Sequence, residues 1–200
     1  MAANALPVLS GFEIVALAAS AGGLKALTEV LAALPRDFPA ALVVVQHLDP
    51  RHRSLMAEIL GRRTSLLIKE AREGDALERG VALIAPPNHH LLVNAGGRVS
   101  LSQTELVHFV RPSADLLFES TAASYKERAI AVVLTGSGRD GAMGVKAIKK
   151  MGGTVIVQDE KTSEFFGMPD AAQQTGIVDF ILPLAEIAPA LRTLLEGAAT

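Results

Sequence analysis

The chain has 200 residues, of which 50% are hydrophobic and 20% charged, and its formal net charge is -2. This length suits a single domain, and the composition is that of a folded chain rather than a disordered one. The small net charge gives no reason to expect nucleic acid or an anionic membrane as a partner. The sequence contains no cysteine, which excludes disulfides, thiol catalysis and cysteine-ligated metals.

The beginning of the sequence carries no sign of export. Residues 1–11 lack the basic segment of a secretory signal. The apolar run over residues 14–21 is too short to span a bilayer. We therefore expect a cytoplasmic protein.

Apolar runs rich in β-branched residues alternate with helical patterns, which predicts βαβ units and a mainly parallel sheet. The first half predicts strands over 14–18, 41–45 and 65–69. A helix after the first strand has leucines at helical spacing and ends at Pro35. A second helix is capped by Ser54 and closed by Gly61. Its inward-facing residues are expected to be Leu55, Met56, Ile59 and Leu60.

The alternation is interrupted between residues 81 and 102. Apolar runs over 81–85, 91–94 and 99–102 are separated by turn sequences, which predicts an antiparallel hairpin or small meander. The helical and strand patterns then resume. They predict helices over 113–125, 141–151 and 183–196 and strands over 130–134, 154–157 and 179–182. The predicted fold is a doubly wound, three-layer α/β/α domain with a mainly parallel sheet and an inserted antiparallel hairpin.

Three short stretches each follow directly on a predicted buried strand. They are ASAGG at 19–23, QHLDP at 46–50 and TGSGRDG at 135–141. Together they place Ser20, His47 and Asp140 at the carboxyl ends of three strands, the edge of an open α/β sheet where ligands bind. A nucleophile, a base and an orienting carboxylate are the parts of a serine hydrolase. That is our working hypothesis.

Each of these residues also has a plainer interpretation. Ser20 and Asp140 stand where a serine or an aspartate commonly caps the helix that follows it. His47, taken alone, is more typical of a polar loop residue than of a base. Only the occurrence of all three at one edge of the sheet favours a catalytic role.

Other ligand sites fit the sequence poorly. The glycines after the first strand do not match G-x-G-x-x-G, and no acidic residue ends the next strand. A phosphate-binding helix N-terminus stays open as an alternative. The remaining histidines, at 52, 89, 90 and 108, lack the spacing of a zinc motif. We expect neither a metal nor a cofactor.

From residue 12 to residue 196 the chain resembles the catalytic domain of the CheB family of chemotaxis protein-glutamate methylesterases. Five stretches carry the resemblance, at 14–23, 45–50, 111–113, 134–144 and 166–169. The resemblance implies that Ser20 is the nucleophile, His47 the general base and Asp140 the residue that orients the imidazole. It also implies a backbone oxyanion site, for which Ser137 and Ala21 are the candidates.

The same resemblance implies demethylation of glutamyl methyl esters, and deamidation of glutamines, on the cytoplasmic helices of methyl-accepting chemoreceptors. Two positions depart from the family pattern, because Ala21 stands in place of a threonine and Ser137 in place of a methionine. They favour the alternative of a non-catalytic protein-binding module with the same fold. The arginines at 51, 53, 62 and 63 form either a solvated face or a rim that meets acidic receptor helices.

The resemblance also bears on regulation. In the family a receiver domain usually precedes the catalytic domain, whereas only residues 1–11 precede it here. We expect these residues to form an N-terminal extension with no receiver domain. Control by a separate receiver protein in trans stays open.

Overall fold

The computed structural model describes residues 13–47 and 54–196. Its centre is a seven-stranded sheet in the order β3-β4-β2-β1-β7-β8-β9, in which every paired neighbour is parallel. The strands are β1 (Ile14–Ala19), β2 (Ala41–Gln46), β3 (Leu67–Glu70), β4 (Val81–Ile84), β7 (Ala129–Val133), β8 (Thr154–Gln158) and β9 (Phe180–Leu182).

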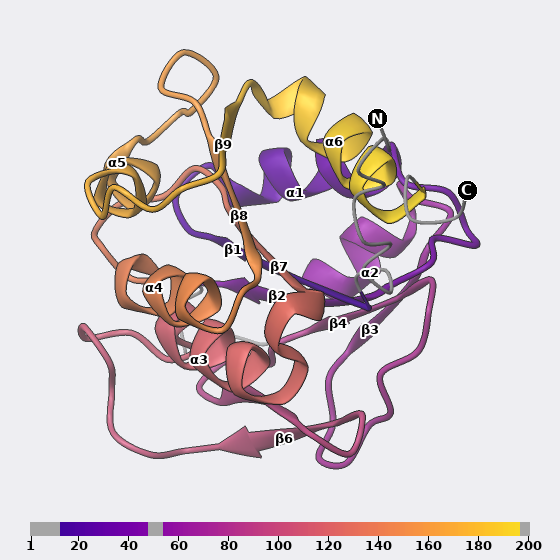
Figure 1. The fold of residues 1–200 in the computed structure, drawn as a ribbon. Helices are drawn as coiled ribbons and strands as arrows, with labels where there is room; N and C mark the ends of the chain where they lie inside the picture. The colour runs from indigo at the N-terminus through magenta and orange to yellow at the C-terminus, as the bar shows by residue number, and fades with distance from the viewer. Residues whose placement is uncertain (1–12, 48–53, 197–200) are drawn as a thin grey trace, which may run out of the picture.

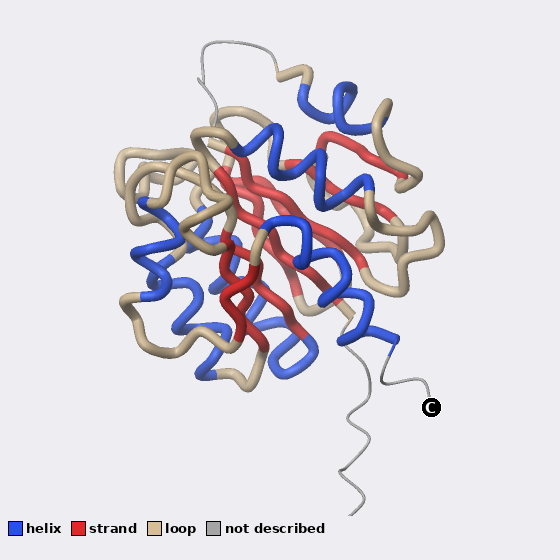
Figure 2. Tube along the Cα trace, turned by 90° about the horizontal axis from the view of Figure 1, so that it is seen from above, coloured by secondary structure: helices blue, strands red, loops and turns tan. Residues whose placement is uncertain are grey.

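Helices cover both faces of the sheet (Figure 1). One face carries α1 (Gly23–Ala32), α2 (Met56–Gly61) and α6 (Leu184–Glu196). The other carries α3 (Ala114–Tyr125), α4 (Ala142–Lys150) and α5 (Gly167–Gln173), and a 3-10 turn (Lys126–Arg128) follows α3. Figure 2 shows the strands running beneath the helices of one face. This three-layer arrangement confirms the predicted fold class.

The central strands are buried on both sides, because successive side chains point to opposite faces of the sheet. Val15 and Leu17 of β1 pack with the α1 and α6 layer, whereas Ile14 and Ala16 pack with the α3 and α4 layer. Every residue of β1, β2 and β7 is buried. Such continuous apolar runs are typical of parallel strands covered by helices.

The direction of winding changes at β1, which pairs with β2 on one side and with β7 on the other. In open α/β sheets ligands bind outside the carboxyl ends of the strands at such a switch point. The register pairs Ala19 with Gln46, so the next residues of the two strands, Ser20 and His47, leave the sheet side by side.

The inserted hairpin consists of β5 (His90–Asn94) and β6 (Arg98–Ser102), which form a separate antiparallel sheet. It lies outside α3 (Figure 1), where Ser124 Oγ donates to the carbonyl of Val93 over 2.9 Å.

The prediction that the run over 81–85 belongs to this hairpin region is wrong. β4 lies in the parallel sheet beside β2, where all four of its residues are buried.

Other differences from the sequence prediction are local. The helix α5 was not predicted. Met56 and Leu60 of α2 are buried as expected, but the exposed fractions of Leu55 and Ile59 are 52% and 37%. Among the helices of the described ranges, none has the length and apolar character needed to cross a membrane.

The contact between α3 and α4 depends on a glycine. A Cβ atom at Gly144 would lie 2.6 Å from Cβ of Phe118 and 3.0 Å from the carbonyl oxygen of Asp115. Gly144→Ala should therefore lower the free energy of unfolding by about 1–3 kcal/mol through overpacking, despite the better helix propensity of alanine. Urea denaturation measures the change. Gly96→Ala is the control, because a Cβ there would meet no atom within 4 Å. Equal stability of the two variants would contradict this account.

Candidate active site

Ser20 lies directly after β1, and its backbone is held on three sides. Its N–H donates to the carbonyl of Thr135 over 3.0 Å, and its carbonyl accepts from the N–H of Gly23 over 2.9 Å. The same carbonyl accepts from Nε2 of Gln46 over 2.7 Å. The N-cap of α1 is Gly22, at φ 75°, with no side-chain capping bond. The plain interpretation of Ser20 as a helix cap is therefore wrong.

His47 is fixed next to Ser20 through the buried side chain of Gln46. Besides binding Ser20, Nε2 of Gln46 donates to the carbonyl of His47 over 3.0 Å. The N–H of His47 continues the pairing of the two strands by donating to the carbonyl of Ala19 over 3.1 Å. One amide group thus bridges the two residues that follow β1 and β2.

The imidazole of His47 contacts Asp140. Its Nε2 lies 2.9 Å from Oδ2 of Asp140, and the side chains are only 12% and 3% exposed. Asp140 comes from the loop between β7 and α4, far from His47 in the sequence. The long loop after β7 therefore brings a carboxylate back to the end of β2.

Asp140 binds the start of α3, not the start of its own helix. The N-cap of α4 is Gly141, with no side-chain capping bond, so the plain interpretation of Asp140 is also wrong. Its carboxylate accepts from Oγ of Ser113 over 2.9 Å and from the N–H groups of Ala114 and Asp115 over 2.5 and 3.1 Å. The positive end of the α3 dipole favours a negative charge at this place.

These contacts set the charge of Asp140. Burial alone would raise the pKa of Asp140, but hydrogen bonds from His47, Ala114 and Asp115 outweigh it and lower the pKa below its ordinary value. Asp140 is therefore a carboxylate at neutral pH. A carboxylate can only accept, so the bond to His47 needs the proton on Nε2 of the imidazole. Nδ1 of His47 is then the basic nitrogen.

Asp115, in α3, makes the reciprocal contact with the start of α4. Its Oδ1 accepts from the N–H groups of Gly141 and Gly144 at the start of α4, over 2.9 and 2.7 Å. Its Oδ2 lies 3.1 Å from Nε2 of His108. Burial, with the nearby negative charge of Asp140, raises the pKa of Asp115. The start of α3 is thus bound by an aspartate that precedes α4, and the start of α4 is bound by an aspartate of α3.

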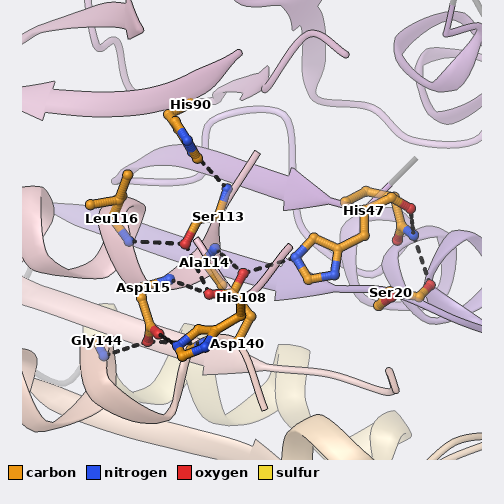
Figure 3. Close-up of polar contacts among 12 residues, drawn as sticks. Ser20, His47, His90, His108, Ser113, Ala114, Asp115, Leu116, Asp140 and Gly144 are labelled. Atoms are coloured by element: carbon orange, nitrogen blue, oxygen red, sulfur yellow. Dashed lines mark hydrogen bonds and ion pairs between the residues drawn. The ribbon is translucent and has the colours of Figure 1, made fainter. Parts of the chain in front are cut away.

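Figure 3 shows the arrangement that results, with Asp140 on one side of the His47 ring and Ser20 on the other. The structure thus brings together the three residues singled out by the sequence. Their catalytic roles stay predictions.

The two candidate oxyanion residues lie on loops that touch each other beside Ser20. Oγ1 of Thr135 donates to the carbonyl of Ala21 over 3.1 Å. Ser137 follows Gly136, where a Cβ atom would lie 2.8 Å from Cβ of Ser20. This approach explains the glycine in the second loop. The use of the Ala21 and Ser137 N–H groups as oxyanion donors stays a prediction.

A cavity of about 730 Å³ opens beside Ser20, between α1 and α2. Leu24, Met56 and Ile59 give it an apolar wall, and Arg63 is among its charged lining residues. This cavity explains why Ile59, expected in the core, is partly exposed.

Sequence reasoning missed the buried polar side chains that order these loops. Gln46 and Gln158 end β2 and β8, and the N–H of Thr135 donates to Oε1 of Gln158 over 2.8 Å. A glutamine that ends an otherwise apolar strand is the signal that could have revealed both. Ser113 is also buried, and the sequence marked it by its position at the start of a helix and in the 111–113 stretch, without revealing its contact with Asp140.

Some predicted features fall outside the described ranges. His52, Arg51 and Arg53 lie there, so the structure says nothing of them. In residues 13–47 and 54–196, no three His, Asp or Glu side chains gather as metal ligands would.

Comparison with known proteins decides the family. A family model described as CheB methylesterase matches residues 15–191. The chain belongs to the CheB methylesterase family. The crystal structure of the Thermotoga maritima CheB methylesterase catalytic domain matches with a TM-score of 0.87 at 38% identity, over 92% of this chain and 98% of that one.

Curated relatives in the CheB family agree. A protein-glutamate methylesterase/protein-glutamine glutaminase of Moorella thermoacetica is 43% identical over 192 residues, which cover 94% of this chain and 45% of the relative. One from Pyrococcus horikoshii is 44% identical over 176 residues, which cover 86% of this chain and 48% of the relative. The chain spans about half the length of the curated relatives it matches.

The lowered pKa of Asp140 predicts a particular acid sensitivity. Between its ordinary value of about 3.9 and the lowered value, the unfolded chain binds a proton that the folded chain does not. The stabilisation from Asp140 is therefore complete above about pH 4 and is lost as the pH falls through the lowered pKa. Asp140→Asn should flatten this part of the pH dependence of the free energy of unfolding, measured by urea denaturation. Asp37→Asn, at an exposed position, is the control, and the same acid slope in all three proteins would refute the assignment.

Proposed function

We propose that residues 12–196 form a serine hydrolase domain that removes methyl groups from glutamyl methyl esters of methyl-accepting chemoreceptors. By the same chemistry it would deamidate receptor glutamines. The observation that carries the proposal is the bond between His47 and Asp140 beside Ser20, in a chain of the CheB methylesterase family. The relatives are named as protein-glutamate methylesterases and protein-glutamine glutaminases. The substrate helices are cytoplasmic, and we place the protein there.

In the first half-reaction the Ser20 hydroxyl attacks the ester carbonyl while Nδ1 of His47 takes its proton. Asp140, held on Nε2, stabilises the imidazolium and keeps the ring oriented. The tetrahedral intermediate collapses, and His47 returns the proton to the departing methoxide, which leaves as methanol. With glutamine as substrate, ammonia leaves instead.

In the second half-reaction water hydrolyses the glutamyl ester on Ser20. Nδ1 of His47 takes a proton from the water as it attacks the acyl carbonyl. The proton then passes to Oγ of Ser20 as the bond to the acyl group breaks. The products are a glutamate carboxyl group on the receptor and the free enzyme.

The two departures from the family pattern are compatible with this chemistry. The negative oxygen of each tetrahedral intermediate needs N–H donors fixed in advance. The candidates, Ala21 and Ser137, would donate from the backbone, and a backbone donor survives a change of side chain. The non-catalytic alternative loses support for the same reason.

Substitution of the three residues tests the proposal. Ser20→Ala and His47→Ala should abolish release of methanol from methylated receptor, and Asp140→Asn should lower kcat by about 10⁴-fold because the imidazole loses its productive tautomer. Methanol released from radiolabelled receptor methyl esters measures all three. Ser100→Ala, in β6, is the control and should keep full activity.

A serine-directed fluorophosphonate probe separates the two functions. It should label Ser20 in the folded wild-type chain and not in Ser20→Ala. A folded wild-type protein that takes up no label and releases no methanol would favour the non-catalytic binding module.

Arg63 allows a test of receptor docking, because it is exposed and lines the cavity beside Ser20. Arg63→Glu should raise the KM for methylated receptor severalfold, with a smaller effect on a small soluble ester, if the cavity edge meets acidic receptor helices. Arg79→Glu is the control, because Arg79 precedes β4 at the opposite edge of the sheet. Equal losses on both substrates would show that Arg63 has no part in docking.

A further inference from the structure

His90 is a buried histidine that the proposed reaction does not use. It begins β5, and its side chain is fully buried. Its Nε2 lies 3.0 Å from the carbonyl oxygen of Glu105, and its Nδ1 lies 3.1 Å from the backbone nitrogen of Ser113. Figure 3 shows the ring of His90 directed at Ser113.

These two partners determine the protonation of His90. The carbonyl of Glu105 can only accept a hydrogen bond, so Nε2 must carry a proton. The N–H of Ser113 can only donate, so Nδ1 must be bare. Burial, with a smaller contribution from the positive charge of Arg111, lowers the pKa of His90. The ring is therefore held as one neutral tautomer.

The residue that His90 contacts is central to the candidate active site. Ser113 is the N-cap of α3, and its Oγ donates to Oδ1 of Asp140. The next two backbone N–H groups, of Ala114 and Asp115, donate to the same carboxylate. A shift of Ser113 would displace three of the four donors that hold Asp140, the fourth being His47.

We propose that His90 is a positioning residue for the Asp140–His47 pair. As a neutral acceptor it fixes the N–H of Ser113, and through Ser113 it fixes the start of α3 against the Asp140 carboxylate. The inserted hairpin thereby supports a site to which it contributes no reacting group. The assignment rests on the proposed function, because it gives His90 a part in orienting that pair.

An apolar side chain at position 90 could fill the same space but could not bind Ser113 or Glu105. It would leave the buried N–H of Ser113 and the carbonyl of Glu105 without a partner. The two contacts of His90 are also separable by substitution. In His90→Asn, the side-chain oxygen lies near the position of the histidine Nδ1 and can accept from the N–H of Ser113. In His90→Gln, the side-chain nitrogen lies near the position of the histidine Nε2 and can donate to Glu105, but no acceptor is left for Ser113.

The experiment compares His90→Asn with His90→Gln in the full chain. The first readout is the resonance of the His47 Nε2 proton in protein labelled with ¹⁵N-histidine, because its chemical shift reports the bond to Asp140. His90→Gln should move or broaden this resonance, and His90→Asn should leave it in place. The control is His89→Gln, since His89 contacts the carbonyl of Pro87 and not Ser113.

The second readout is turnover of methylated receptor. His90→Gln should lower kcat by about 10- to 100-fold with little change in KM, the scale found when outer partners of metal-ligating side chains are removed. His90→Asn should stay within about threefold of the wild type, well above the glutamine variant. Activities are compared per folded molecule, from thermal unfolding curves.

Two results would overturn the proposal. One is an unchanged His47 resonance in a folded His90→Gln protein. The other is loss of the resonance and of activity in a folded His90→Asn protein, which keeps the acceptor. If His90→Gln does not fold, the asparagine variant alone decides. The resonance does not depend on turnover, so an inactive wild type would refute the proposed function, while a shift in His90→Gln would still support the positioning role.

Discussion

The candidate active site depends on two aspartates, at the starts of α3 and α4, that each bind the N-terminus of the neighbouring helix. Asp140, which precedes α4, binds the start of α3, and Asp115, in the first turn of α3, binds the start of α4. Two buried negative charges near each other are unfavourable, but each meets the positive end of a helix dipole and several donors. These reciprocal contacts fix the starts of both helices against each other. The absence of a side chain at Gly144 lets α3 and α4 pack closely. The direction of Asp140 toward His47 follows from this packing.

Ser20 and His47 are held by a different set of contacts, namely the pairing of two strands and the hydrogen bonds of one glutamine. Parallel pairing of β1 and β2 places them side by side, and Gln46 binds both of their carbonyls. The glycines complete this arrangement, because Cβ atoms at Gly23 and Gly136 would collide with Gln46 and Ser20 respectively. A site that needs fixed geometry is thus built at strand ends, where side chains are positioned more precisely than on loops.

The sequence predicted what depends on local pattern. Buried strands followed by Ser20 and His47 are visible in the chain, because a short apolar run before a polar residue marks a strand end. Asp140 was found by its glycine-rich surroundings, but its contact with α3 was not, since a side chain that caps a distant helix leaves no local signature. The run at 81–85 was misassigned for a related reason: a buried parallel strand and a hairpin strand are equally apolar and equally short. His90 was considered only as a metal ligand and set aside for its spacing, because contacts with residues 105 and 113 leave no local pattern in the sequence.

Residues 13–47 and 54–196 contain two aspartate–histidine pairs of similar geometry, and the surroundings of the two pairs differ. His108 lies 3.1 Å from Asp115, but its side chain is 42% exposed, and its carboxylate partner has a raised pKa. Thr175 lines a cavity with His108, yet its hydroxyl donates to the carbonyl of Ala172 within its own turn. His47 is nearly buried, its partner has a lowered pKa, and Ser20 stands beside it. A base needs a stable counter-charge and a hydroxyl within reach. Of the two pairs, His47 and Asp140 fit these needs better, and we keep the role of base as a proposal for His47, whereas Asp115 serves the packing of α3 against α4.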